Sequence, residues 1–246
     1  MEPTREEGLR QRLRAAGAEE LHRLVDEHLG EIDLQAARQA LRNPFCDARV
    51  ILRLLQQRRL VSSYDLRREV AAHPATPLAQ AQRLIPGLYW RDLLEIGLDT
   101  RLRPTVRRSA ELRLIDRLPG LAVGEKRIIA RRASAGVVRA VRHDPSPRVI
   151  EALLENPRLT EGLLLPTVTA EGAAPAVLAL VARSPRWGVR YPLRVALIQN
   201  PKTPPATALQ LLPMLKKSDL RALLSDLRLP LAVRRRAALL LGQPPA

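Results

Sequence analysis

Apolar residues recur three and four positions apart along short stretches of the chain. Alanine, leucine and isoleucine follow this spacing in the segment 81–88, AQRLIPGL, and Val106, Ala110 and Leu114 follow it in a segment that begins near Thr105. This spacing places the apolar side chains on one face of an α-helix. Because one short helix cannot bury its own apolar face, the pattern predicts helices stacked on neighbours of the same kind.

Prolines mark the ends of the predicted helices. An asparagine or histidine followed by proline recurs at Asn43-Pro44, His73-Pro74, Asn156-Pro157 and Asn200-Pro201, and a related stop, Arg-Leu-Pro, occurs at 117–119. Proline disfavours helical conformation in the residue before it, and the threonine of Asn-Pro-x-Thr-Pro is suited to cap the next helix. The 21 prolines therefore indicate boundaries between helices and do not indicate disorder.

The chain contains an internal duplication. When the sequence is shifted against itself by 127 residues, residues 66–114 align with residues 193–241 without a gap, and 21 of the 49 pairs are identical. Self-similarity at a fixed distance is typical of repeat architectures. The later stop signals follow one another at steps of about 40 to 44 residues, so the shift of 127 corresponds to three repeats, each of two or three short helices.

Three phrases of the chain resemble a known repeat family. LRREVAAHPATPLAQAQRLI, LRVALIQNPKTPPATALQLL and PRVIEALLENPRLTEGLLL are similar to the leucine-rich repeat variant family and its HEAT-repeat relatives. The resemblance covers about residues 40–242 and implies an all-α fold, a right-handed α-solenoid of HEAT-like helical repeats. Residues 43–246 are then expected to form a basic α-solenoid of about five repeats.

The chain departs from these families in two respects. The leucine-rich repeat variant prototype carries an iron–sulfur cluster on a cysteine-rich segment, which Cys46 alone cannot supply. HEAT units often place an aspartate shortly before a Val-Arg pair, whereas Asp99 and Arg107, like Asp226 and Arg234, are more widely spaced. A ladder of Asp–Arg pairs between repeats is therefore suggested by the resemblance alone.

Residues 1–42 differ from the remainder in charge. They carry seven basic against nine acidic residues, whereas the other 204 residues carry 34 basic and 16 acidic residues. Thr4 and Asp33 precede amphipathic stretches and are expected to be helix N-caps. We expect residues 1–42 to form an acidic N-terminal helical cap that covers one end of the solenoid with a polar face.

Composition narrows the class of protein. The formal net charge is +16, and 37 of the 41 basic residues are arginine. Arginine suits bidentate contact with phosphate, but a GC-rich genome would also place arginine where lysine could stand, and both explanations stay open.

The single cysteine, Cys46, excludes an intramolecular disulfide and is expected in the core. No apolar leader and no run near the ~18 apolar residues of a membrane span is evident, so we expect a soluble, cytoplasmic protein without a membrane partner.

Enzymatic chemistry has little support in the sequence. The four histidines lack metal-ligand neighbours at useful spacing, and no phosphate-binding glycine motif or nucleophile elbow occurs. We therefore expect no catalytic residue, no cofactor, no metal and no small-molecule substrate. The best enzymatic alternative is a HEAT-like DNA glycosylase, in which the residues that hold damaged DNA would be Trp90, Asp92, Trp187 and Tyr191. Asp92 recurs as Asp219 in the duplicate, which favours a structural role.

Arginine pairs occupy equivalent places in the repeats. Arg107-Arg108 and Arg234-Arg235 follow the first apolar residue of duplicated helices and lie off the apolar stripe. Stacked repeats would align such residues into a basic strip that tracks a phosphate backbone. The nucleic-acid-binding candidates are Arg107, Arg108, Arg131, Arg132, Arg234, Arg235, Arg236, Lys216 and Lys217. The leading hypothesis is a non-enzymatic scaffold that engages the backbone of DNA or RNA, and the competing explanation is ordinary solvent-exposed charge.

The turn after Leu88 and Leu215 differs between the two copies. One copy has Tyr89-Trp90-Arg91, and the other has Lys-Lys-Ser at 216–218. An exposed Tyr-Trp-Arg cluster suits a protein-interface hot spot, whereas a tryptophan folded back on the solenoid would be structural. The alternative function is therefore a protein–protein interaction scaffold for an acidic partner.

Overall fold

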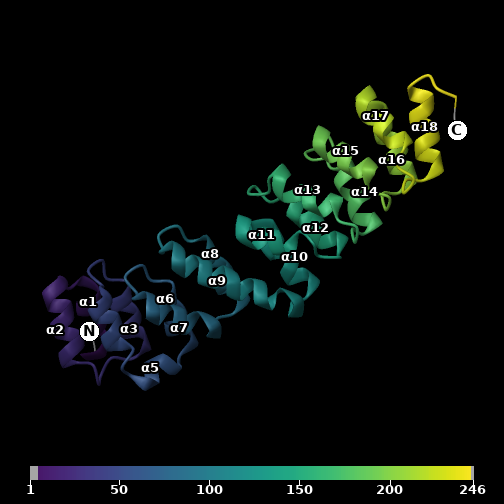
Figure 1. Cartoon of the computed structure of the whole chain (residues 1–246). Helices are drawn as coiled ribbons and strands as arrows, with labels where there is room; N and C mark the ends of the chain where they lie inside the picture. Colours follow the sequence, from purple (N-terminus) through teal and green to yellow (C-terminus); the bar gives the residue numbers. More distant parts are fainter. Residues whose placement is uncertain (1–4, 245–246) are drawn as a thin grey trace. The chain divides into compact units, whose positions relative to one another are not determined.

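A computed structural model describes residues 5–244, and in this range the chain forms 18 α-helices, three short 3₁₀ helices and no strand (Figure 1). The helices fall into two compact units, Met1–Arg117 and Leu118–Ala246. The all-α expectation is confirmed for the described part of the chain.

The first unit contains the acidic segment together with the first copy of the duplication. Its elements are α1 (Arg5–Ala15), α2 (Ala18–Glu27), α3 (Leu34–Leu41), α4 (Ala48–Leu54), α5 (Arg58–Ser62), α6 (Tyr64–Ala71), α7 (Leu78–Leu84), η1 (Ile85–Gly87), α8 (Trp90–Leu98) and α9 (Pro104–Arg117). Within it α1 packs on α3, α3 on α6, α2 on α4 and α7 on α9.

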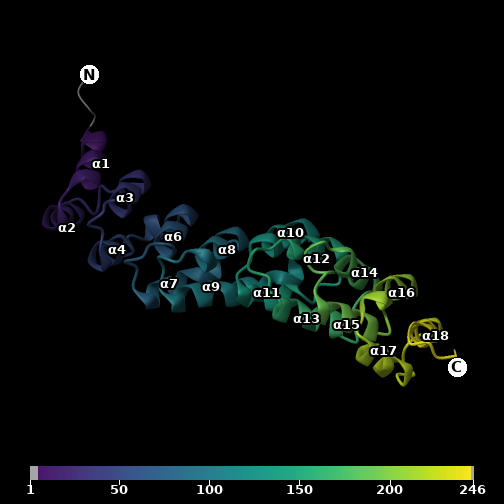
Figure 2. The same cartoon turned by 90° about the horizontal axis from the view of Figure 1, so that it is seen from above.

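The second unit contains the second copy of the duplication. Its elements are η2 (Leu118–Gly120), α10 (Val123–Arg132), α11 (Ala135–Val141), α12 (Pro147–Leu154), α13 (Glu161–Thr169), α14 (Pro175–Arg183), α15 (Tyr191–Gln199), α16 (Pro205–Leu211), η3 (Leu212–Met214), α17 (Lys217–Leu224) and α18 (Leu231–Leu240). Helix α12 packs on α10 and α14, and α13 packs on α11 and α15, so alternate helices form two rows (Figure 2).

The helices follow the period of the sequence. Helices α6, α9, α12 and α15 begin at Tyr64, Pro104, Pro147 and Tyr191, which are steps of 40, 43 and 44 residues. The order α6, α7, η1, α8, α9 returns as α15, α16, η3, α17, α18. Three helices therefore occupy each step of the repeat.

The predicted apolar stripes are confirmed. Val106, Ala110 and Leu114 in α9 are all buried, and so is Val233, the counterpart of Val106 in α18. Cys46 is buried as well, and burial together with the charge of neighbouring Asp47 raises the pKa of its thiol to about 12. Burial places Cys46 in the core, as predicted, and the raised pKa leaves little of the thiolate that reacts.

Buried asparagines join the ends of parallel helices. Asn156, which follows α12 and is fully buried, donates from Nδ2 to the carbonyls of Ala130 (2.7 Å) and Ala133 (3.0 Å) at the end of α10. Its Oδ1 accepts the backbone N–H of Arg158 at 2.8 Å. The last carbonyls of a helix have no partner within the helix, so an outside donor is needed where they are buried. The same arrangement ties Asn43 to Leu13 and Ala16, and Asn200 to Val168 and Ala170.

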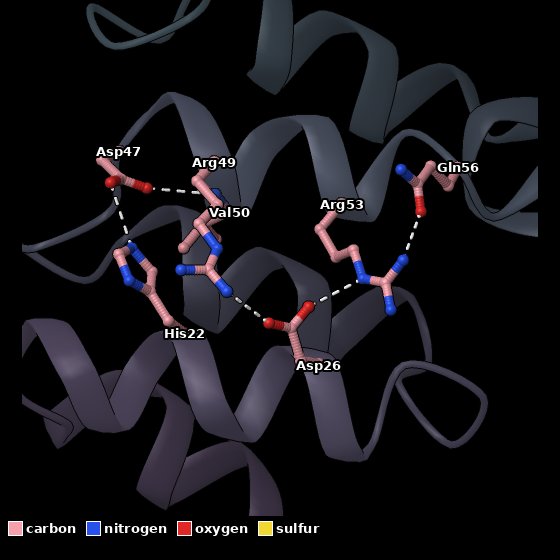
Figure 3. Close-up of polar contacts among 7 residues, drawn as sticks. All are labelled: His22, Asp26, Asp47, Arg49, Val50, Arg53 and Gln56. Carbon is pink, nitrogen blue, oxygen red and sulfur yellow. Dashed lines mark hydrogen bonds and ion pairs between the residues drawn. The ribbon is translucent and has the colours of Figure 1, made fainter.

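The acidic helices are attached to the first repeat by charged side chains. Asp26 of α2 accepts hydrogen bonds from Arg49 (2.9 Å) and Arg53 (2.7 Å) of α4 (Figure 3). Asp47 caps α4 by accepting the N–H of Val50 at 3.0 Å, and its other oxygen contacts Nε2 of His22 at 3.0 Å. Asp33 caps α3, as predicted, whereas Thr4 lies outside the described residues.

Candidate nucleic-acid interface

The positive charge of the chain is concentrated in the second unit. Residues 1–117 contain 21 basic and 17 acidic residues, whereas residues 118–246 contain 20 basic and only 8 acidic residues. The formal net charges are thus +4 and +12. The basic side chains of the second unit thus exceed its acidic side chains by 12.

The duplicated arginine pairs occupy matching places in α9 and α18. Arg108, Arg235 and Arg236 are exposed, whereas Arg107 and Arg234 are only partly exposed. The Nε atoms of Arg107 and Arg234 are both buried without a hydrogen-bond acceptor. Their guanidinium charges lie close enough to Asp99 and Asp226, respectively, to stabilise those carboxylates. In each pair the second arginine is therefore the one presented to solvent.

Asp99 and Asp226 each form an ion pair with an arginine two residues further along the same turn. Asp99 pairs with Arg101 at 2.7 Å, and Asp226 pairs with Arg228 at 2.8 Å. The hydrogen bond from Arg101 lowers the pKa of Asp99, and the one from Arg228 lowers the pKa of Asp226. These Asp–Arg pairs lie within one turn, so they do not link successive repeats.

The candidate cations occupy different parts of their helices. Arg131 and Arg132 end α10, and Arg131 pairs with Glu155 at 2.8 Å, whereas Arg234, Arg235 and Arg236 lie in the middle of α18. Lys216 and Lys217 are exposed at the start of α17, and the Nζ of Lys216 lies 5.0 Å from the ring centre of Tyr191. Arg107 and Arg108 belong to the first unit and the other seven candidates to the second. The single strip across all nine residues stays a prediction.

The Tyr-Trp-Arg cluster surrounds the start of α8. Tyr89 is 64% exposed, and its ring centre lies 4.5 Å from that of Tyr64. Arg91 stacks over the partly exposed Trp90, with its guanidinium carbon 5.2 Å from the ring centre. This cluster offers an exposed aromatic surface on the first unit.

Asp92 has a structural partner in the same region. The hydroxyl of Tyr64 donates to Asp92 and accepts the backbone N–H of Tyr89 at 2.8 Å. Burial and the hydrogen bond to Asp92 raise the pKa of Tyr64 to about 12. The duplicate repeats the arrangement, because Tyr191 donates to Asp219 and accepts the N–H of Lys216 at 2.9 Å. Both aspartates therefore fix a turn of the fold.

Trp187 is part of the packing of α14 against α12. It is 2% exposed, and its indole N–H donates to the carbonyl of Leu154 at 2.9 Å. The sequence Ser-Pro-Arg-Trp at 184–187 parallels Asn-Pro-Arg-Leu at 156–159, a match that could have revealed its buried place. The next residue, Gly188, has its Cα so close to Ala182 that a Cβ would lie 2.1 Å from that carbonyl oxygen, and only glycine fits.

A groove of the first unit lies between α6 and α8. It has a volume of about 520 Å³ and is lined by charged residues of both signs. Arg68 lies 3.7 Å from Glu69 and 4.0 Å from Asp92, and Arg101 binds Asp99, so both arginines of the groove are paired with carboxylates. Over residues 5–244 no group of three or more histidine, cysteine or acidic side chains could hold a metal ion.

Two findings bear on the kind of protein. No protein-family model, curated protein or solved structure matches this chain. None of the helices between residues 5 and 244 combines the length and the apolar character needed to cross a bilayer.

Proposed function

We propose that the protein is a non-enzymatic binding scaffold, a right-handed HEAT-like α-solenoid whose second unit engages the phosphate backbone of DNA or RNA. The observation that carries the proposal is the +12 charge of the second unit, against +4 for the first. A surface with so large an excess of positive charge attracts a polyanion, whose condensed counterions are released on binding.

The aromatic residues indicate how the nucleic acid would be bound. The second unit has only two aromatic residues, Trp187, which is buried, and Tyr191, which is partly exposed and carries Lys216 over its ring. Stacking of unpaired bases requires exposed aromatic faces. We therefore expect contact with phosphates and little dependence on base sequence.

The period of the helices supports the solenoid. Each step of 40 to 44 residues brings three helices, and alternate helices pack on one another within each unit. Such units bury their apolar faces only against their neighbours, which is the principle of a solenoid.

The test is fluorescence anisotropy of generic duplex DNA and structured RNA with the full chain across a salt series. If about five phosphates are engaged, the log–log slope of affinity against salt should be near −4 to −5, at ~0.9 per phosphate. Different base sequences should give the same affinity within a few fold. An absence of binding at ~50 mM salt would contradict the proposal and favour an acidic protein as the partner.

A further inference from the structure

The connections of the second unit lie at two opposite edges. Neighbouring helices joined by short connections run antiparallel, so the connections that follow α10, α12, α14 and α16 emerge on one side and those that follow α11, α13, α15 and α17 on the other. Figure 2 shows the two rows of helices that produce these edges.

Hydrogen bonds join the connections of the first edge to one another. Arg158 donates to the carbonyl of Arg132 at 3.2 Å, which links the segment after α12 to the end of α10. Arg186 donates to the carbonyls of Asn156 (3.3 Å) and Leu159 (3.4 Å), which links the segment after α14 to the segment after α12. Lys216, after η3, donates its backbone N–H to Tyr191, which directly follows the α14 connection. The four connections therefore form a continuous surface.

The two edges differ in charge. We define the arginine edge as the connections after α10, α12, α14 and α16, each with the last two residues of its helix: 131–134, 153–160, 182–190 and 210–216. These segments carry six arginines and one lysine against a single glutamate, Glu155. The opposite edge, defined in the same way as 140–146, 168–174, 198–204 and 223–230, carries three basic and three acidic residues.

Neither of the ordinary explanations produces this difference. A genome that favours arginine would enrich both edges equally. Cations are also favoured near helix C-termini by the helix dipole, but both edges are built from helix C-termini, four at each. The arginine edge therefore has a formal net charge of +6, whereas the charges of the opposite edge cancel.

Two arginines of the edge are held in place before any partner arrives. Arg158 and Arg186 are bound to backbone carbonyls, and the guanidinium carbon of Arg186 lies 4.5 Å from the ring centre of Trp187. A side chain already ordered loses less entropy on binding. Arg183 and Arg190 are exposed on the same connection.

We propose that the arginine edge is the surface along which the backbone of a duplex nucleic acid lies. This inference rests on the proposed function and names the site for it. Four connections separated by interhelical distances of about 8–10 Å extend over roughly 24–30 Å. One strand of duplex DNA presents a phosphate every ~3.4 Å along its axis, so the edge is long enough for about five contacts.

The experiment compares two charge reversals of equal size in the full chain. The edge variant is Arg183→Glu with Arg190→Glu, and the control is Arg148→Glu with Lys202→Glu. Arg148, at the start of α12, and Lys202, in segment 198–204, are exposed at the opposite edge. Each pair lowers the net charge by four, and both are titrated against 20-base-pair DNA and RNA duplexes.

We expect the edge variant to bind at least tenfold more weakly than the control at ~100 mM salt, with a salt slope shallower by about 2, at ~0.9 per lost phosphate contact. Because Arg183 ends α14, the neutral pair Arg183→Gln with Arg190→Gln is measured as well, and it should weaken binding in the same direction. A circular dichroism melt verifies that the glutamine variant is folded. If the glutamate variant unfolds, the binding of the glutamine variant decides the test.

The outcomes separate the two proposals. If wild type binds and both reversals weaken binding equally, the arginine edge is wrong and the proposed function stands. If wild type binds neither duplex at ~50 mM salt, both the proposed function and the proposed binding site at the arginine edge are wrong. Preference for the DNA or the RNA arm identifies which duplex the edge accommodates.

Discussion

Three buried asparagine side chains each satisfy the terminal carbonyls of a neighbouring helix. Asn43, Asn156 and Asn200 are 3%, 0% and 6% exposed, and each donates to two carbonyls at the end of a neighbouring helix. An asparagine can do this because it offers two donors and an acceptor on one short, planar group. The asparagine before proline therefore ends one helix and also hydrogen-bonds to the end of a neighbouring helix.

Replacement of Asn156 by alanine should lower the free energy of unfolding by about 3 kcal/mol, because buried carbonyls and a buried N–H lose their partners. Asn156→Asp should be at least as damaging, since a carboxylate cannot donate to carbonyls. Urea denaturation measures the change, with Gln210→Ala on the exposed face of α16 as a control that should shift stability by less than ~0.5 kcal/mol. An effect of Asn156→Ala no larger than that control would contradict the role assigned to the amide.

At the scale of elements, α6 and α15 are copies that end differently. Where α15 has Asn200, α6 has His73, whose Nε2 contacts the carbonyl of Leu41 at 3.1 Å while Nδ1 accepts the N–H of Ala75 at 3.2 Å. Both contacts are satisfied only by the neutral ring with its proton on Nε2. Burial, helped by the charge of Arg101, lowers the pKa of His73 below its usual 6.5.

This difference predicts a pH effect on stability. As pH falls below 6.5, His73 takes up a proton in the unfolded chain before it does so in the folded one, so folding loses stability. The loss continues until the pH passes the lower pKa of the folded state. His73→Asn should remove this component, and urea midpoints of the two proteins between pH 8 and 5 measure it. A parallel decline in both would show that His73 is not its source.

At the scale of the whole molecule, the two units have similar helices but different net charges. The first unit holds its acidic helices through pairs such as Asp26 with Arg49 and Arg53, and its net charge is small. The second unit has the same kind of helices but 20 basic residues against 8 acidic ones. A shared repeat therefore serves two chemically different surfaces.

The proposed solenoid has a consequence for size in solution. A compact globule of 246 residues would have a radius of gyration of about 18 Å. A solenoid extends with each repeat, so small-angle X-ray scattering should give a clearly larger value at low concentration and ~300 mM salt. A value near 18 Å would contradict the solenoid while leaving the helices unaffected.

Much of the fold was readable from local patterns. The stripe that contains Val106, Ala110 and Leu114 is buried as its spacing predicted, because helical periodicity depends on residues close together in the chain. The candidate site was readable only in part. Composition and the duplication pointed to arginine pairs, but not to the fact that Arg107 and Arg234 lie half-buried beside aspartates.

Helix identity, the ends of helices at Asn-Pro and the repeat period followed from the amino-acid sequence, since each depends on neighbours within a few residues or on direct comparison of the copies. The predicted N-cap was wrong for Thr203, which donates to the carbonyl of Leu197 and does not cap α16. The partners of Asn156, the burial of Trp187 and the unequal charge of the two edges depended on the folded chain. The hydrogen bonds of Asn156 and Trp187 join residues 23 to 33 positions apart, such as Trp187 with Leu154, and only the packing of alternate helices brings such residues together.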